Sequence, residues 1–229
     1  GGAQLFNISV VDPAEPPLFP FKPNLARNLL IVGGTVLDNV CANEQSGVIR
    51  ASDADTGRLV WNWDPANPEQ TAPIAPGQTY TPNSPNSWTT MAADEALGLV
   101  YVPLGNQPPD QWGAKRTPAV EKYSSSIVAL DLQTGQVRWS FQTVHHDLWD
   151  YDVPSQPSLL DLRVGGQTVP VLVQPTKQGE LFVLDRRDGR PVLPVTEQPA
   201  PQGAGEGDFT APTQPRSALS LDPPPPSGA

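Results

Sequence analysis

The chain has 229 residues, a formal net charge of −10 at pH 7 and a sequence pI of about 4.5. Nucleic-acid binding depends on lysine and arginine side chains that neutralise phosphates, so this acidic balance argues against a nucleic-acid partner. The single cysteine, Cys41, excludes an internal disulfide framework. No apolar run reaches the roughly 20 residues that span a bilayer. The sequence does not begin with methionine, and we expect it to be part of a longer protein.

Proline and glycine punctuate the whole chain, with 29 and 19 residues respectively. Such punctuation predicts many short elements joined by turns. Residues 1–28 contain five prolines that interrupt any regular element, so we expect an irregular lead-in there. A short β-type run over residues 29–36 follows and ends at a pair of glycines and a Thr-Val step.

A repeated hairpin pattern is the main signal for the fold. Residues 49–61 align with residues 127–139, residues 181–190 form a shorter third copy, and residues 93–102 form a partial fourth. Each copy contains a strand and an Asp-x-x-x-Gly turn, and the complete copies continue into a second strand. Glycine supplies the positive φ that such turns need, and aspartate bonds back to the turn backbone. The pattern predicts an all-β protein.

The spacing of the copies favours an array of similar sheets rather than separate domains. Four-stranded propeller blades fit this spacing once loops are counted, and a β-sandwich is the alternative. Trp61 and Trp139 follow the turn glycines by four residues and are predicted to pack against a neighbouring unit. Residues 64–88 and 105–124 read as long loops, which are often functional. Residues 191–229 are expected to have little structure of their own.

Residues 145–152 hold both histidines of the chain, three carboxylates and two aromatic residues. They follow a strand-like run and are expected on a loop, where binding and catalytic groups concentrate. Asp147, Asp150 or Asp152 offers a general base if it lies near a substrate hydroxyl. The alternative is that the aromatic residues belong to the core and the carboxylates cap turns. Adjacent histidines on a strand point to opposite faces, which argues against a shared metal ion.

Three further positions suggest a binding site. Asp38 and Asn39 supply hard oxygen ligands suited to Ca²⁺ or Mg²⁺, although this dipeptide is also an ordinary turn. Trp88 ends the loop of residues 64–88, where it serves either as a stacking platform for a planar ligand or as a core plug. Lys177 directly precedes the predicted strand of residues 180–185, and a lone lysine there is usually a surface residue.

These strings together resemble the pyrroloquinoline quinone (PQQ)-dependent dehydrogenases. The tryptophan repeats resemble their docking motifs. Four strings resemble the membrane-bound glucose dehydrogenase branch, which also holds quinate and polyol dehydrogenases: Asp38-Asn39 with residues 46–50, residues 83–88, residues 143–150, and Lys177 with residues 184–187. The resemblance implies an eight-bladed β-propeller, of which residues 29–195 would form about three blades. Residues 1–28 would then be an irregular lead-in from a truncated upstream part, and residues 196–229 a Pro/Gly-rich excursion or tail.

The resemblance also implies roles for individual residues. Asp150 resembles the catalytic base, which takes the proton from the substrate hydroxyl. Lys177 and Trp88 resemble the residues that contact the PQQ oxygens and stack on its ring plane. Asp38 and Asn39 match the metal-binding pair, whose Ca²⁺ or Mg²⁺ ion acts as a Lewis acid.

The implied activity is oxidation of a sugar, D-glucose to gluconolactone, with electrons passed to ubiquinone. The resemblance implies a periplasmic position on the bacterial inner membrane, with a membrane anchor that lies outside this chain. We expect the isolated chain to be inactive. Two alternatives remain: a quinate/shikimate or other polyol dehydrogenase of the same family, and a non-catalytic propeller scaffold of the outer-membrane assembly type.

Two departures from the wider family bear on this assignment. The vicinal cysteine pair of the methanol dehydrogenase branch is missing, because Cys41 stands alone, which agrees with the glucose-type branch. Pro108 replaces a hydroxyl residue that some glucose enzymes place near the cofactor. That cofactor contact is therefore not expected in this chain.

Overall fold

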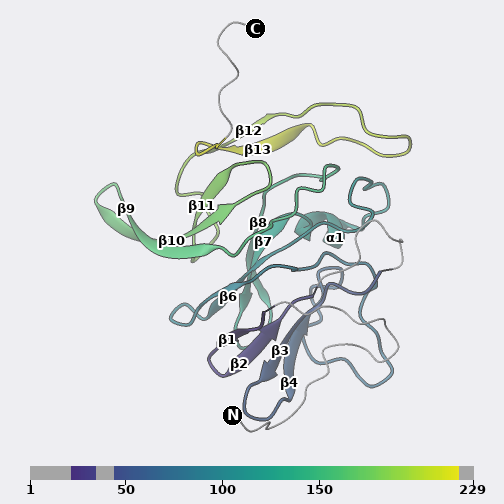
Figure 1. The fold of residues 1–229 in the computed structure, drawn as a ribbon, viewed down its shortest axis with the longest axis vertical. Coiled ribbons are helices and arrows are strands. Elements are labelled where there is room, and N and C mark those ends of the chain that lie inside the picture. The colour runs from purple at the N-terminus through teal and green to yellow at the C-terminus, as the bar shows by residue number, and fades with distance from the viewer. Residues whose placement is uncertain (1–21, 35–43, 222–229) are drawn as a thin grey trace, which may run out of the picture.

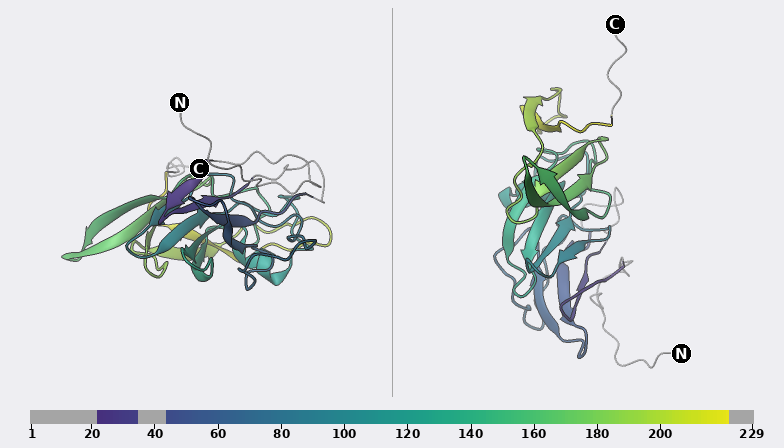
Figure 2. Two further views of the ribbon diagram at one scale, coloured as in Figure 1. Left: turned by 90° about the horizontal axis from the view of Figure 1, so that it is seen from below. Right: turned by 90° about the vertical axis from the view of Figure 1, so that its left-hand side faces the viewer.

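The computed structural model of the chain describes residues 22–34 and 44–221. Short antiparallel sheets follow one another in chain order, from β1–β4 at one end of the molecule to the β12–β13 hairpin at the other (Figure 1). Figure 2 shows the sheets one after another along the long axis in the side view, and the β9–β10 hairpin projecting outward in the view from below. The prediction of an all-β array is confirmed.

The first two sheets each contain four antiparallel strands in sequence order. The first sheet consists of β1 (Asn24–Ala26), β2 (Leu29–Val32), β3 (Ile49–Asp53) and β4 (Leu59–Trp63). The second consists of β5 (Ala92–Asp94), β6 (Leu99–Pro103), β7 (Ser126–Asp131) and β8 (Val137–Gln142). All four predicted hairpin copies therefore map onto strands and their turns, including the third copy, which forms β11.

The third sheet has three strands, and a separate hairpin follows it. The strands are β9 (Ser158–Val164), β10 (Gln167–Pro175) and β11 (Leu181–Asp185), then β12 (Val195–Pro199) and β13 (Thr213–Ser217). The expectation that residues 191–229 have little structure is wrong for the described part, because β12 and β13 pair over five residues each. Long-range contacts hold this hairpin, and they leave no local signal in the sequence.

The repeated turns have the predicted geometry. In the first copy, Asp53 Oδ1 accepts hydrogen bonds from the backbone N–H of Thr56 at 2.8 Å and from its hydroxyl at 2.7 Å. Gly57 has φ +75° and donates to the carbonyl of Asp53. Asp131 accepts the same bonds in the second copy. The aspartate and the glycine therefore fix the turn that joins the two strands.

Tryptophan residues join the first sheet to the second and the second sheet to the third. The Trp61 indole N–H donates to the carbonyl of Leu132 at 2.8 Å, and the ring lies against Gly135. A Cβ atom added at Gly135 would lie 2.7 Å from the ring, and φ there is +70°, so only glycine fits without strain. Trp139 repeats the arrangement against Gly189 of the third sheet. The predicted packing of both tryptophans against a neighbouring unit is confirmed.

The second sheet buries both of its faces. Along β6, Val100 and Val102 pack in the cluster shared with the first sheet, whereas Leu99 and Tyr101 pack in the cluster shared with the third. Side chains of a strand alternate between the two faces of the sheet, so an uninterrupted apolar run is what a doubly covered strand requires. A two-layer sandwich would leave one face exposed to solvent, and that alternative is excluded.

The long loops differ in structure. Residues 64–88 have no helix or strand, as expected. Residues 105–124 contain a short helix, α1 (Pro118–Tyr123), which the sequence analysis did not predict. The Thr117 hydroxyl accepts from the backbone N–H of Val120, and Pro118 occupies the first helical position, which together favour a helix start. In the described ranges, no helix is long and apolar enough to cross a bilayer.

Replacing Gly135 with alanine tests the interlock between sheets. We expect a loss of about 2–5 kcal/mol in the free energy of unfolding, because the substitution combines a strained backbone with overpacking against Trp61. Gly165→Ala is the matched control: φ there is +57°, but no atom lies within 4 Å of the added Cβ. It should cost only about 1–2 kcal/mol. Equal losses in urea denaturation would contradict the interlock.

Candidate active site

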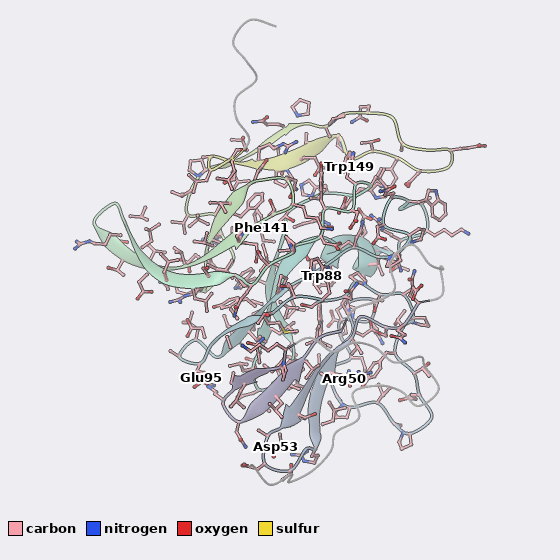
Figure 3. All side chains as sticks on the ribbon, viewed as in Figure 1. Arg50, Asp53, Trp88, Glu95, Phe141 and Trp149 are labelled. Atoms are coloured by element: carbon pink, nitrogen blue, oxygen red, sulfur yellow. The ribbon has the colours of Figure 1, made fainter. Side chains whose placement is uncertain are left out.

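Three of the predicted site residues converge from different parts of the chain. Trp88 ends a loop before the second sheet, Asp150 lies on the loop after β8, and Lys177 lies between β10 and β11. The Lys177 ammonium donates to Asp150 Oδ1 at 2.9 Å and to the Asp150 carbonyl at 2.8 Å. It also lies over the Trp88 ring, 5.9 Å from the ring centroid. Trp88 occupies the middle of the molecule in Figure 3.

Asp152 connects these three residues, and the sequence analysis named it only as one possible base. Its Oδ2 accepts from the Trp88 indole N–H at 2.9 Å and from Lys177 Nζ at 3.4 Å. Its Oδ1 accepts from the backbone N–H of Asn106 at 2.6 Å. The side chain is only 5% exposed. Asp152 is therefore a buried acceptor that fixes both the aromatic ring and the cation.

Asp147 shapes the loop that carries Asp150. Its buried carboxylate accepts hydrogen bonds from the Ser125 hydroxyl at 2.6 Å and from the backbone N–H groups of Trp149 and Tyr151, both at 2.8 Å. Asp150 lies between those two residues with φ +62°. Burial raises the pKa of Asp147, and the three hydrogen bonds oppose that rise. Asp147 therefore caps a turn of the backbone, which is the structural role that the sequence analysis gives as the alternative to a general base.

The electrostatics of the cluster favour a charged lysine. Burial alone would lower the pKa of Lys177, but the hydrogen bond to Asp150 and the charges of Asp152 and Asp150 outweigh it and raise the pKa. The lysine side chain is 30% exposed and that of Asp150 34% exposed, so both can be reached from solvent. The site thus combines one accessible carboxylate, one buried carboxylate and one accessible cation.

Oxygen ligands for a metal ion gather in the same place. One carboxylate oxygen from each of Asp110, Asp150 and Asp152 lies within 4.8 Å of the other two. Hard oxygen donors of this kind suit Ca²⁺ or Mg²⁺. The predicted ligands Asp38 and Asn39 lie outside the described residues, so their assignment stays a prediction. The donor chemistry beside Asp150 fits a hard cation.

The two histidines have no part in this cluster. The ring of His146 lies between Glu121 Oε1 at 3.0 Å and Asp208 Oδ1 at 2.8 Å, and it stacks on Phe209 with the centroids 3.7 Å apart. His145 bonds instead to residues of β8 and β12 through its two ring nitrogens. Their different partners agree with the argument against a shared metal ion. Both histidines tie the segment of residues 195–217 to the sheets.

Lys177→Met tests the charge balance of the cluster. We expect the free energy of unfolding to fall by about 1–2 kcal/mol at pH 7, because Asp152 stays buried without its cation. The folded state raises the pKa of Lys177, so this contribution is fully present below the ordinary lysine value of 10.5 and is lost only above it. The difference from wild type should therefore stay constant between about pH 7 and 10 in urea denaturation.

Arg138→Met is the control for that substitution. Arg138 pairs with Asp131 at 3.2 Å, but its side chain is 59% exposed. An exposed pair of this kind contributes about 0–1 kcal/mol. A loss as large as that of Lys177→Met would contradict a special role for the buried cluster.

Comparison with known proteins now identifies the family. The family model described as "PQQ: Glucose/ethanol/alcohol dehydrogenase, beta-propeller domain" matches residues 13–228. The quinoprotein glucose dehydrogenase of Escherichia coli (strain K12) is 50% identical over 212 residues, which are 93% of this chain and 26% of that protein. The glycerol dehydrogenase large subunit of Gluconobacter oxydans (strain 621H) is 49% identical over 197 residues, 85% of this chain and 26% of that protein.

Two further relatives extend the comparison. The quinate/shikimate dehydrogenase (quinone) of Acinetobacter baylyi is 44% identical over 196 residues, 85% of this chain and 24% of that protein. The crystal structure of the quinohemoprotein alcohol dehydrogenase from Comamonas testosteroni superposes with a TM-score of 0.60 at 26% identity, covering 85% of this chain and 30% of that one. The chain spans about a quarter of the length of the curated relatives. It belongs to the β-propeller family of PQQ-dependent glucose, ethanol and alcohol dehydrogenases, and it forms a partial propeller of about three blades.

Proposed function

We propose that this chain is the part of a PQQ-dependent dehydrogenase that holds the quinone and carries the catalytic base. The complete enzyme would oxidise D-glucose to gluconolactone and pass the electrons to ubiquinone. The observation that carries the proposal is the convergence of Trp88, Asp150 and Lys177 on one cluster, with Lys177 Nζ 2.9 Å from Asp150 and 5.9 Å from the Trp88 centroid. Three loop residues from separate parts of the chain would not be expected to meet in one cluster by chance.

The residues of the cluster fit a planar, anionic quinone. An indole ring offers a flat apolar surface for stacking, and an accessible ammonium group offers a charged donor to quinone or carboxylate oxygens. Trp88 and Lys177 supply these two groups within one site. When bound, PQQ supplies the electron-accepting group of the reaction. In the proposed enzyme, Trp88 orients the ring plane and Lys177 fixes its oxygens.

Asp150 is the best candidate for the base among the three carboxylates of its loop. A general base must reach the proton that it abstracts. Asp147 and Asp152 are buried, and each uses both carboxylate oxygens for hydrogen bonds within the protein. Asp150 has a side chain that is 34% exposed, and Lys177 fixes its orientation. Asp150 would therefore accept the proton of the substrate hydroxyl.

The substrate proposal depends on the relatives. Glucose dehydrogenases from three bacteria are 46–50% identical to this chain, whereas the quinate/shikimate enzyme is 44% identical. The glycerol dehydrogenase large subunit, at 49%, lies within the same range. All of these relatives are named for substrates that carry hydroxyl groups. We therefore propose D-glucose as the substrate, with quinate and other polyols as the competitors to test.

The cellular setting of the complete protein follows the same resemblance. We propose that the enzyme faces the periplasm, with an inner-membrane anchor in a segment outside this chain. The isolated chain should reduce no dye, because a partial propeller leaves apolar faces and strand edges uncovered. The scaffold alternative lacks a specific observation in its favour, since a scaffold does not need Trp88, Asp150 and Lys177 in one cluster.

Reconstitution of the complete protein with PQQ and Ca²⁺ tests the proposal. Dye reduction would be measured side by side with D-glucose and quinate, and PQQ binding by the quenching of tryptophan fluorescence. Activity on glucose is the expected result. Activity on quinate alone would overturn the substrate assignment but keep the family chemistry. A folded protein that binds no PQQ would support the scaffold alternative.

Asp150→Asn should separate binding from chemistry in that protein. We expect PQQ binding to be kept and kcat to fall by about 10²–10⁴-fold, the contribution typical of a general base. This corresponds to about 3–5 kcal/mol of barrier at 1.36 kcal/mol per tenfold. Asp161→Asn is the control, because that carboxylate is 63% exposed and pairs with Arg186. Near-normal turnover in Asp150→Asn would remove the residue from its role.

Asp38→Ala tests the predicted metal ligands. If Asp38 and Asn39 hold the ion, activity of the substituted protein should need a Ca²⁺ concentration at least tenfold higher during reconstitution. The expected shift follows from the loss of one charged oxygen ligand from a Ca²⁺ or Mg²⁺ site. Titration of the metal-free protein with Ca²⁺ gives the measurement. An unchanged requirement would place the ion with other ligands.

A further inference from the structure

A pocket lies between the β12–β13 hairpin and residues 143–157, the loop that carries Asp150 and is called the catalytic loop below. Its volume is about 110 Å³, and its lining includes Trp149, Tyr151, Gln178, Gln214 and Arg216. Because roughly 10–15 Å³ holds one water molecule, the pocket has room for a small organic ligand. Figure 3 shows Trp149 close beneath the hairpin. Trp88, Asp150 and Lys177 are not among the lining residues.

The pocket adjoins the proposed active site through the chain itself. Trp149 and Tyr151 are the direct neighbours of Asp150, and Gln178 directly follows Lys177. Consecutive Cα atoms are 3.8 Å apart, so the pocket wall and the charged cluster are one residue from each other. A ligand that occupies the pocket would therefore contact both chain neighbours of the residue that we propose as the base.

The cation of the pocket is held in place before any ligand arrives. Arg216 Nη1 donates to Glu180 Oε1 at 2.8 Å. Glu180 is buried, and its other oxygen accepts from the backbone N–H of Ser217 at 2.7 Å. Guanidinium carries five N–H donors. In the described residues the structure records one hydrogen bond from Arg216, so its remaining donors are available to a ligand.

The other lining groups narrow the chemistry of that ligand. Gln178 donates to the Thr143 carbonyl at 3.2 Å, but its buried Oε1 has no hydrogen-bond partner and requires a donor. Trp149 and Tyr151 stack with their centroids 6.1 Å apart and present apolar ring surface. A carboxylate alone would satisfy Arg216 but not Gln178. A hydroxyl group both donates and accepts, and the C–H face of a polyol ring suits an aromatic wall.

The hairpin that closes the pocket is firmly attached to the catalytic loop. Gln214 Oε1 accepts from the backbone N–H of His145 at 2.7 Å, and Gln214 Nε2 donates to the carbonyl of the same residue at 2.6 Å. The ring of His146 bonds to Asp208 at 2.8 Å in the loop between β12 and β13. The two histidines thus hold the β12–β13 segment against the loop that carries Asp150, a role outside the proposed chemistry.

We propose that this pocket binds the hydroxyl-bearing ring of the substrate, with Arg216 and Gln178 as specificity-determining residues. The inference rests on the proposed dehydrogenase function for the identity of the ligand as substrate. Arg216 would donate to ring hydroxyl oxygens, Gln178 Oε1 would accept a hydrogen bond from a ring hydroxyl, and Trp149 with Tyr151 would cover the apolar face. Substrates with a ring would then be preferred over open three-carbon polyols.

The test measures binding without turnover. The complete protein, prepared free of PQQ, is titrated with D-glucose, quinate and glycerol, and binding is followed by saturation-transfer NMR. We expect D-glucose or quinate to bind, glycerol to bind at least tenfold more weakly, and Gln178→Leu and Arg216→Gln each to weaken ring binding at least tenfold. Arg190→Gln is the control, since that side chain is 85% exposed and pairs with Asp188.

The outcomes separate this inference from the proposed function. If Arg216→Gln lowers the unfolding midpoint because Glu180 loses its partner, Gln178→Leu carries the test alone. Unchanged ring binding in Gln178→Leu, or glycerol binding as tight as glucose binding, would overturn the pocket assignment. Ring binding that depends on Gln178 in a protein that never binds PQQ would keep the pocket and overturn the dehydrogenase. In the active enzyme, both variants should raise KM about tenfold with kcat within twofold.

Discussion

The contact between a tryptophan ring and a turn glycine of the next sheet sets the arrangement of the whole molecule. Trp61 and Trp139 make this contact at successive interfaces, each with an indole N–H bound to a backbone carbonyl across the interface. A flat ring against a bare backbone allows little variation in the angle between two sheets. The loops that carry Trp88, Asp150 and Lys177 meet in one common region of this array.

In that common region, neighbouring carboxylates have different roles. Asp147, Asp150 and Asp152 lie within six residues, yet their environments differ in burial and in the number of donors. Asp147 caps the loop backbone, and Asp152 holds Trp88 and Lys177. Asp150 retains access to solvent. A buried carboxylate with every oxygen occupied is a structural element, whereas the accessible one can exchange a proton with a bound molecule.

The sequence predicts the features that depend on short-range contacts. The Asp-x-x-x-Gly turns and their strands follow from residues three or four apart, and the tryptophan packing follows from the repeat. The β12–β13 hairpin was missed because its anchors, such as the Gln214 contact with His145, join residues far apart in the chain. The sequence does not predict the central role of Asp152 for the same reason, since its hydrogen-bond donors come from the distant residues Trp88 and Asn106. Helix α1 was missed because its Thr-Pro start lies inside a proline-rich loop.

The doubly covered strand β6 has a consequence for how such a chain can change over generations. Insertion or deletion of one residue in β6 would exchange the faces on which Val100 and Tyr101 lie. The Tyr101 hydroxyl, which donates to the Arg186 carbonyl at 3.0 Å, would then be turned toward the first sheet, away from that acceptor. Length variation among descendants of this sequence should therefore accumulate in the mostly exposed residues 69–82 and at the tip of the β9–β10 hairpin, while the strands of the middle blade keep their length.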